Sequence, residues 1–134
     1  MYSLPVRIYW EDTDAGGVVY HAQYLAFMER ARSEWMRHHC GGQDALRRAH
    51  GLVFAVRAMT LDFLKPARLD DALDVTVELV DCRRASLVFR QAVLRDGERL
   101  CEATVRIAAL DAAGFRPMAI PVALHSQLMS LLSP

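Results

Sequence analysis

Residues 24–35 read Tyr-Leu-Ala-Phe-Met-Glu-Arg-Ala-Arg-Ser-Glu-Trp. Apolar side chains return at three- and four-residue intervals in this stretch, which predicts a helix with one wide buried face. That face consists of Tyr24, Leu25, Phe27, Met28, Ala31 and Trp35. Two adjacent glycines, Gly41 and Gly42, favour an end of the helix at that point, because glycine readily takes the left-handed conformation that closes helices.

Strand patterns stand on both sides of this helix. Residues 73–79 alternate strictly between apolar and polar side chains, which is typical of an antiparallel strand with one buried face. The expected strands cover residues 6–10, 53–63, 73–82, 87–94 and 99–110. A short helix at 43–50 and a helical tail at 121–132 complete the pattern, with Val122, Leu128, Leu131 and Leu132 as expected docking residues of the tail. One long helix with five antiparallel strands predicts an α+β fold.

Composition and charge narrow the functional classes. The length of 134 residues predicts a single domain over 1–134, and a hydrophobic content of 53% is ample for its core. Lys plus Arg and Asp plus Glu number 16 each, so the basic excess of nucleic-acid binders is absent. No window approaches the roughly 18 apolar residues of a membrane helix, and the N-terminus does not resemble a signal peptide. Three distant cysteines, Cys40, Cys82 and Cys101, predict free thiols in the cytoplasm.

Residues 11–21 carry the chemistry: Glu-Asp-Thr-Asp-Ala-Gly-Gly-Val-Val-Tyr-His. They place carboxylates and two glycines just before the predicted helix, where unpaired backbone N–H groups form a positive end. Such N–H groups can hold a developing oxyanion while a carboxylate attacks a carbonyl or activates water. The same residue types also build ordinary turns and helix caps, and this motif alone leaves both readings open. A calcium loop is disfavoured because Gln23 stands where the final acid is required.

Other reaction classes find no motif in this sequence. His38-His39-Cys40 lacks the partner spacing of a metal site, since neighbouring helix residues point in different directions, and no metal is expected. The sequence contains no Gly-x-Ser-x-Gly elbow, no phosphate-binding P-loop and no Gly-x-Gly-x-x-Gly fingerprint.

A family resemblance extends the reading of residues 11–21. The run Val6-Arg7-Ile8-Tyr9-Trp10-Glu11-Asp12-Thr13-Asp14-Ala15-Gly16-Gly17-Val18-Val19-Tyr20-His21-Ala22 resembles the signature of the YbgC-type acyl-CoA thioesterases, hotdog-fold relatives of 4-hydroxybenzoyl-CoA thioesterase. The likeness continues through residues 27–34, 59–71 and 85–89 and fades only after about residue 110. It implies the hotdog fold, in which a curved antiparallel sheet of about five strands wraps a long helix, and it implies hydrolysis of acyl-CoA.

The resemblance also assigns roles to residues of the loop. Asp14 matches the catalytic aspartate, whereas Asp12 matches an acid with a structural role. His21 matches the histidine that closes the motif, with its N–H on the oxyanion and its imidazole near the reacting groups. Gly17 and Tyr20 are expected to contact substrate. An aspartate is ionised but weakly basic at neutral pH, so Asp14 suits either a nucleophile or a general base.

Coenzyme A needs cations for its phosphates. Arg83 and Arg84, followed by Ser86, match the basic run that meets the nucleotide in the 4-hydroxybenzoyl-CoA enzyme, although Ala85 stands where that enzyme has lysine. Further candidate phosphate contacts are Arg57, Lys65, Arg68 and Arg116. Coenzyme A is part of the substrate, and no separate cofactor is expected.

The resemblance implies a homodimer or homotetramer with active sites between subunits. Two alternatives to hydrolysis remain at this point. Hotdog folds also host hydration and dehydration of acyl thioesters, because a fold does not determine a function. The chain could also bind acyl thioesters or an acyl carrier protein as a partner of an envelope-associated complex, with little turnover.

Overall fold

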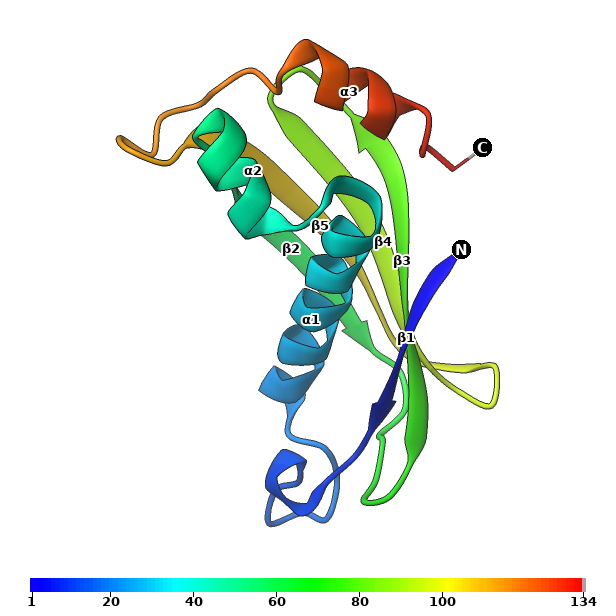
Figure 1. Ribbon diagram of the computed structural model, residues 1–134. Helices are drawn as coiled ribbons and strands as arrows, with labels where there is room; N and C mark the ends of the chain where they lie inside the picture. Colours follow the sequence, from blue (N-terminus) through cyan, green and yellow to red (C-terminus); the bar gives the residue numbers. More distant parts are fainter. Residues whose placement is uncertain (134) are drawn as a thin grey trace.

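A computed structural model describes residues 1–133 (Figure 1). It contains five strands, three α-helices and one short 3-10 helix in this part of the chain. In chain order these are β1 (Tyr2–Arg7), η1 (Trp10–Asp12), α1 (His21–Cys40), α2 (Gln43–His50), β2 (Leu52–Phe63), β3 (Ala72–Cys82), β4 (Ser86–Arg95), β5 (Glu98–Asp111) and α3 (Val122–Met129).

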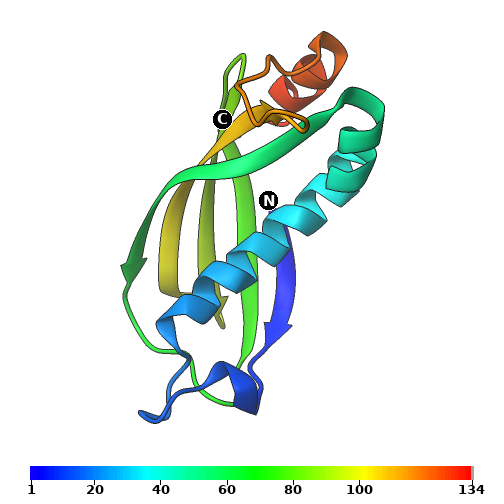
Figure 2. The same cartoon turned by 90° about the vertical axis from the view of Figure 1, so that its left-hand side faces the viewer.

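The five strands form one antiparallel sheet in the order β1-β3-β4-β5-β2. The sheet curves, and α1 lies diagonally across its concave face (Figure 2). This arrangement confirms the predicted α+β plan and the hotdog fold. The order leaves β1 and β2 as the two edges, and β2 pairs only with β5 among the described residues.

Helix α1 forms because its sequence pattern matches a helical period, and it ends where predicted. Gly41 is the C-cap in the left-handed conformation, and its N–H donates to the Met36 carbonyl oxygen. The buried side of the helix carries Tyr24, Phe27, Met28, Ala31, Trp35 and Met36. These side chains meet the inward-facing residues of β3, β4 and β5 in one continuous core. Leu25 is the exception among the predicted helix-face residues, because its side chain is exposed.

The first strand is shifted relative to its prediction at residues 6–10. Strand β1 instead begins at Tyr2 and ends at Arg7, because it pairs with β3 and β3 itself starts at Ala72, opposite Arg7. The chain then turns through η1, so Trp10 is exposed rather than part of a strand. Pro5 is tolerated in β1 because an edge strand does not need every N–H for pairing.

The C-terminal tail packs as a helix, although with fewer docking residues than predicted. Leu124 and Leu128 of α3 are buried, and Leu131 and Leu132 pack against the core. Val122 was expected to dock, but it is 84% exposed because it begins the helix on the solvent side. Within residues 1–133, no helix has both the length and the hydropathy that a membrane crossing would require.

Candidate active site

Asp14 lies at the start of a tight turn between η1 and α1. Its N–H donates to the Val18 carbonyl oxygen at 2.9 Å, and its own carbonyl accepts the Gly17 N–H at 3.0 Å. Its Oδ1 accepts the Gly16 N–H at 2.8 Å. A Cβ at Gly16 would lie 3.1 Å from that oxygen, so glycine allows the carboxylate to fold over the backbone. The residue is exposed, and Oδ2 accepts no hydrogen bond from residues 1–133.

Asp12 differs from Asp14 because both oxygens of its carboxylate accept hydrogen bonds from within the chain. The residue is buried, Oδ2 accepts the Tyr9 N–H at 2.8 Å, and Oδ1 accepts Gln23 Nε2 at 2.8 Å. Its carbonyl oxygen accepts the Tyr20 N–H at 2.9 Å. Asp12 therefore ties β1 and η1 to the beginning of α1, which agrees with the structural role implied by the resemblance.

The beginning of α1 leaves two backbone donors free. Tyr20 is the N-cap, and the Gln23 N–H donates to the Tyr20 carbonyl oxygen at 2.9 Å. The N–H groups of His21 and Ala22 have no acceptor within residues 1–133. Both donors lie at the positive end of a 20-residue helix, where a developing negative charge is stabilised.

A cavity of about 270 Å³ opens beside this helix end. It is lined by Val19, His21, Tyr24, Phe63, Leu64, Lys65 and Pro66. The His21 ring lies 4.5 Å from the Tyr20 ring and 6.3 Å from the Phe63 ring, centroid to centroid. The lining is mostly apolar, with the polar helix end at one side, which suits a hydrocarbon group carrying a carbonyl. Asp14, Gly17 and Tyr20 lie outside this lining.

The expected phosphate-binding residues lie far from Asp14 within one chain. Arg83 and Arg84 form the turn between β3 and β4, next to α3 and at the opposite end of the sheet from the acid loop (Figure 1). Arg83 Nε pairs with Asp81 Oδ2 at 3.0 Å, and Ser86 begins β4. One chain thus brings together Asp14, Gly17, Tyr20 and His21, but not Arg83, Arg84 and Ser86.

The four further candidate phosphate contacts lie in different parts of the fold. Arg57 lies at a bulge of β2, and Arg116 lies beyond β5. Lys65 and Arg68 are on the acid-loop side, in the segment that links β2 to β3. Lys65 Nζ pairs with Glu98 Oε2 at 2.6 Å, so its ammonium group has an acidic partner within the chain.

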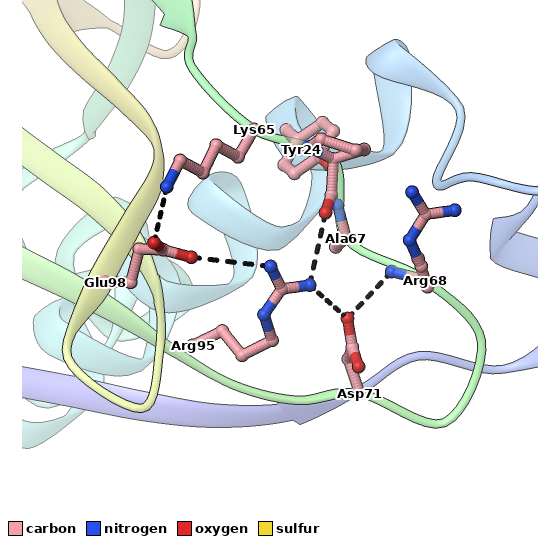
Figure 3. A network of polar contacts seen from close by, with 8 residues as sticks. Tyr24, Lys65, Ala67, Arg68, Asp71, Arg95 and Glu98 are labelled. Atoms are coloured by element: carbon pink, nitrogen blue, oxygen red, sulfur yellow. Dashed lines mark hydrogen bonds and ion pairs between the residues drawn. The ribbon is translucent and has the colours of Figure 1, made fainter.

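Residues 64–71 (the 64–71 segment) link β2 to β3 and contact Arg95 at the end of β4 (Figure 3). Arg95 Nη1 contacts Asp71 Oδ2 at 2.8 Å and the Pro66 carbonyl oxygen at 3.2 Å. The Arg68 N–H also donates to Asp71 Oδ2 at 2.8 Å. Burial alone would raise the pKa of Asp71, but the Arg68 N–H and the Arg95 guanidinium outweigh it, so its pKa is lowered.

This lowered pKa predicts a pH-dependent contribution of Asp71 to stability. A carboxylate whose folded pKa lies below its unfolded value of about 3.9 stabilises the fold above that pH. The stabilisation is lost as the pH falls through the folded pKa. We expect the urea midpoint of Asp71→Asn to be below that of the native chain at pH 7, and the two to converge below about pH 4. A difference that stays constant from pH 7 to pH 3 would contradict this role.

Sequence reasoning named Lys65 and Arg68 of the 64–71 segment as candidate phosphate contacts, but it missed Tyr24 and Ala67 as site residues. Tyr24 was assigned to the buried helix face, and it is buried, but its hydroxyl also bonds to Ala67. Its position three residues after His21, on the same helix face, is the one signal that could have placed it at the site.

The family sequence model of the thioesterase superfamily matches residues 16–102 of this chain. The chain belongs to the thioesterase superfamily. It is 48% identical over 122 residues to the acyl-CoA thioester hydrolase YbgC of Escherichia coli O6:H1, covering 90% of each chain. It is 43% identical over 120 residues to the acyl-CoA thioesterase YbgC of Haemophilus influenzae, covering 90% of this chain and 88% of the relative.

Solved thioesterase structures share the fold. A probable thioesterase from Bartonella henselae superposes with a TM-score of 0.84 at 34% identity, covering 89% of this chain and 98% of the other. The family assignment confirms that this protein is a thioesterase of the YbgC type. Among residues 1–133, no three His, Cys, Asp or Glu side chains gather closely enough to hold a metal ion.

Proposed function

We propose that this thioesterase hydrolyses acyl-CoA to a free acid and coenzyme A, with Asp14 and the beginning of α1 as its catalytic groups. One observation carries the proposal. The exposed Asp14 carboxylate lies on the turn that leads directly into α1, where the His21 and Ala22 N–H groups are free. The YbgC relatives, which are named as acyl-CoA thioester hydrolases, support the substrate class.

These groups support two alternative routes for the reaction. The thioester carbonyl oxygen accepts hydrogen bonds from the free N–H groups, which stabilise the negative charge that develops on it. As a general base, Asp14 takes a proton from water, the hydroxide adds to the carbonyl carbon, and the carbon–sulfur bond breaks. The proton then passes from Asp14 to the CoA sulfur. As a nucleophile, Asp14 instead displaces the CoA thiolate to form a mixed anhydride, which water cleaves.

A second copy of the chain would complete the substrate site. β2 is an open sheet edge whose Val56 and Phe63 are 49% and 52% exposed. A two-fold axis at this edge makes the paired β2 strands antiparallel. The Arg83-Arg84 turn of one copy then comes to the same end as Asp14 of the other. We therefore infer a homodimer, or a homotetramer built from it, in which phosphate contacts and catalytic carboxylate come from different subunits.

A charge placed on the β2 edge tests this pairing. We expect Val56→Asp to convert the dimer to a monomer of 15.1 kDa, because an unpaired carboxylate cannot be buried at a strand–strand contact. CoA release should fall roughly tenfold or more as the shared site is lost. Light scattering coupled to gel filtration gives the mass. Val122→Asp, at an exposed position of α3, is the control that should keep mass and rate. A dimeric Val56→Asp would contradict the pairing.

The cysteines fit a reducing compartment, and we infer a cytoplasmic enzyme. All three thiols are free, and Cys82 and Cys101 are buried. Burial, with smaller contributions from Asp62 and Glu102, raises the pKa of Cys101 to about 11. That thiol stays protonated and unreactive at neutral pH.

The experiment for the proposed reaction compares two activities of the purified protein. Thiol release from acyl-CoA esters of increasing chain length reports hydrolysis, and crotonyl-CoA absorbance reports hydration. The proposal expects CoA release and no hydration. Hydration without CoA release, or tight binding of acyl-CoA without turnover, would replace it by one of the two alternatives.

A further inference from the structure

Ala67 links the two segments that carry the proposed catalytic groups. This residue of the 64–71 segment is fully buried. Its N–H donates to the Tyr24 hydroxyl at 3.0 Å, and both residues are labelled in Figure 3. Its carbonyl oxygen accepts the Val19 N–H at 2.9 Å. The residue is therefore held between helix α1 and the last part of the acid loop. Both bonds lie in a buried region, where an unmade hydrogen bond is costly.

We propose that the Tyr24 hydroxyl is a positioning group for hydrolysis, which sets the acid loop against the beginning of α1 through Ala67. The inference rests on the proposed function, because it assumes that Asp14 and the helix end act on the same carbonyl. Tyr24 is only 3% exposed, and its hydroxyl is directed at a backbone group. It acts through the backbone rather than on the substrate.

The path from Tyr24 to Asp14 consists of short, direct contacts. Val19, which Ala67 holds, is bridged across the loop to Thr13. The neighbouring Val18 carbonyl oxygen accepts the Asp14 N–H at 2.9 Å. In the other direction, Val19 is two residues before His21, the first residue of α1. The contacts of Ala67 with Tyr24 and Val19 (the clamp) thus hold both the acid loop that carries the carboxylate and the free N–H groups of α1. The relative placement of these groups determines the rate of acyl transfer.

The far side of the clamp is anchored in the sheet. Arg95 holds the Pro66 carbonyl oxygen, next to Ala67, and is itself paired with Asp71 and Glu98. The Lys65 N–H donates to the Leu100 carbonyl oxygen at 3.0 Å, which ties the start of the segment to β5. The Tyr24 hydroxyl is thus the contact that connects a rigidly held segment to α1.

Tyr24→Phe tests the proposal, because it removes the hydroxyl and keeps the ring that lines the cavity. We expect kcat for acyl-CoA hydrolysis to fall roughly tenfold with KM within about twofold of the native value, since the acyl pocket is unchanged. Amide hydrogen exchange at Ala67 and Val19 should accelerate roughly tenfold, while the core amide of Val105 in β5 keeps its rate. Tyr2→Phe is the matched control. Tyr2 stacks on His38 and its hydroxyl makes no hydrogen bond within residues 1–133, so kcat and exchange should be unchanged.

Any other outcome contradicts the proposed role of the Tyr24 hydroxyl. A native kcat, a raised KM with unchanged kcat, or a lowered kcat with unchanged exchange at Ala67 and Val19 would assign the hydroxyl a different role. If Tyr24→Phe does not fold, Arg95→Leu serves instead: it frees Pro66 from the other side and should lower kcat severalfold at constant KM. A native kcat in Arg95→Leu would then reject the proposal. Full activity of Asp14→Asn would reject the proposed function separately, while the exchange measurement would still judge the Tyr24–Ala67 contact.

Discussion

Asp14→Asn is expected to lower kcat for acyl-CoA hydrolysis by about a thousandfold, the range seen when a general base or carboxylate nucleophile is lost. An amide neither accepts a proton from water nor attacks a thioester. The Gly16 N–H can still donate to the asparagine oxygen, so the turn should keep its shape. Because Asp14 is exposed, the free energy of unfolding should change by less than about 0.5 kcal/mol. Steady-state CoA release and urea unfolding measure the two effects.

Asp12→Asn is the control, because it removes a carboxylate two residues away. Asp12 is buried and accepts from the Tyr9 N–H and Gln23 Nε2. An amide can replace only one of the two acceptor oxygens, so this change should destabilise the fold by roughly 1–3 kcal/mol. Where the variant remains folded, its kcat should exceed that of Asp14→Asn. Equal loss of kcat in both variants with no loss of stability in Asp12→Asn would contradict this division of roles.

Gln91→Leu is expected to reduce the free energy of unfolding by about 3 kcal/mol, because it leaves the buried Arg32 guanidinium without its hydrogen-bond acceptor. Arg32 of α1 is only 7% exposed, and its Nη1 donates to Gln91 Oε1 at 2.9 Å. Gln91 Nε2 donates in turn to the Met28 and Thr76 carbonyl oxygens at 3.0 and 3.3 Å. Burial lowers the pKa of Arg32, which is the direction expected for a guanidinium withdrawn from water. Urea unfolding at pH 7 measures the loss.

The double variant Arg32→Met, Gln91→Leu separates the charge from the packing. Removing both polar groups leaves no buried guanidinium without its acceptor, so the double variant should be more stable than Gln91→Leu alone. A double variant that loses the sum of the two single effects would show that Arg32 and Gln91 do not depend on each other. Unchanged stability of Gln91→Leu would contradict the account of this core contact.

Periodicity predicted most of the fold because local pattern and tertiary burial agree there. Helix α1 shows its buried face in the spacing of Tyr24, Met28 and Trp35, and β3 shows alternation. The prediction of 6–10 as a strand was wrong because the extent of β1 depends on where β3 begins, opposite Arg7. Pairing register joins residues distant in the sequence, and a local pattern does not contain it.

The candidate site also combines residues that local sequence indicates with contacts that only the tertiary structure reveals. Asp14 and His21 could be proposed as catalytic residues from the sequence because they belong to one continuous motif that resembles the family's signature. The Tyr24–Ala67 bond joins residues 43 positions apart, and the Arg32–Gln91 bond joins residues 59 positions apart. Neither has a signal in local sequence, since a tyrosine on an apolar helix face predicts only burial. Arg83 and Arg84 could be named as cations, but their distance from Asp14 within one chain follows only from the topology of the sheet.

We infer that Asp14 acts in the chemical step rather than in holding the substrate. The most direct measurement pairs binding with turnover in the native protein and in Asp14→Asn. Calorimetric titration with a thioether analogue of acyl-CoA, which cannot be hydrolysed, gives Kd, and thiol release from the matching thioester gives kcat. We predict Kd values within about threefold of each other and CoA release only by the native protein. Turnover by Asp14→Asn, or loss of analogue binding in that variant, would contradict the claim.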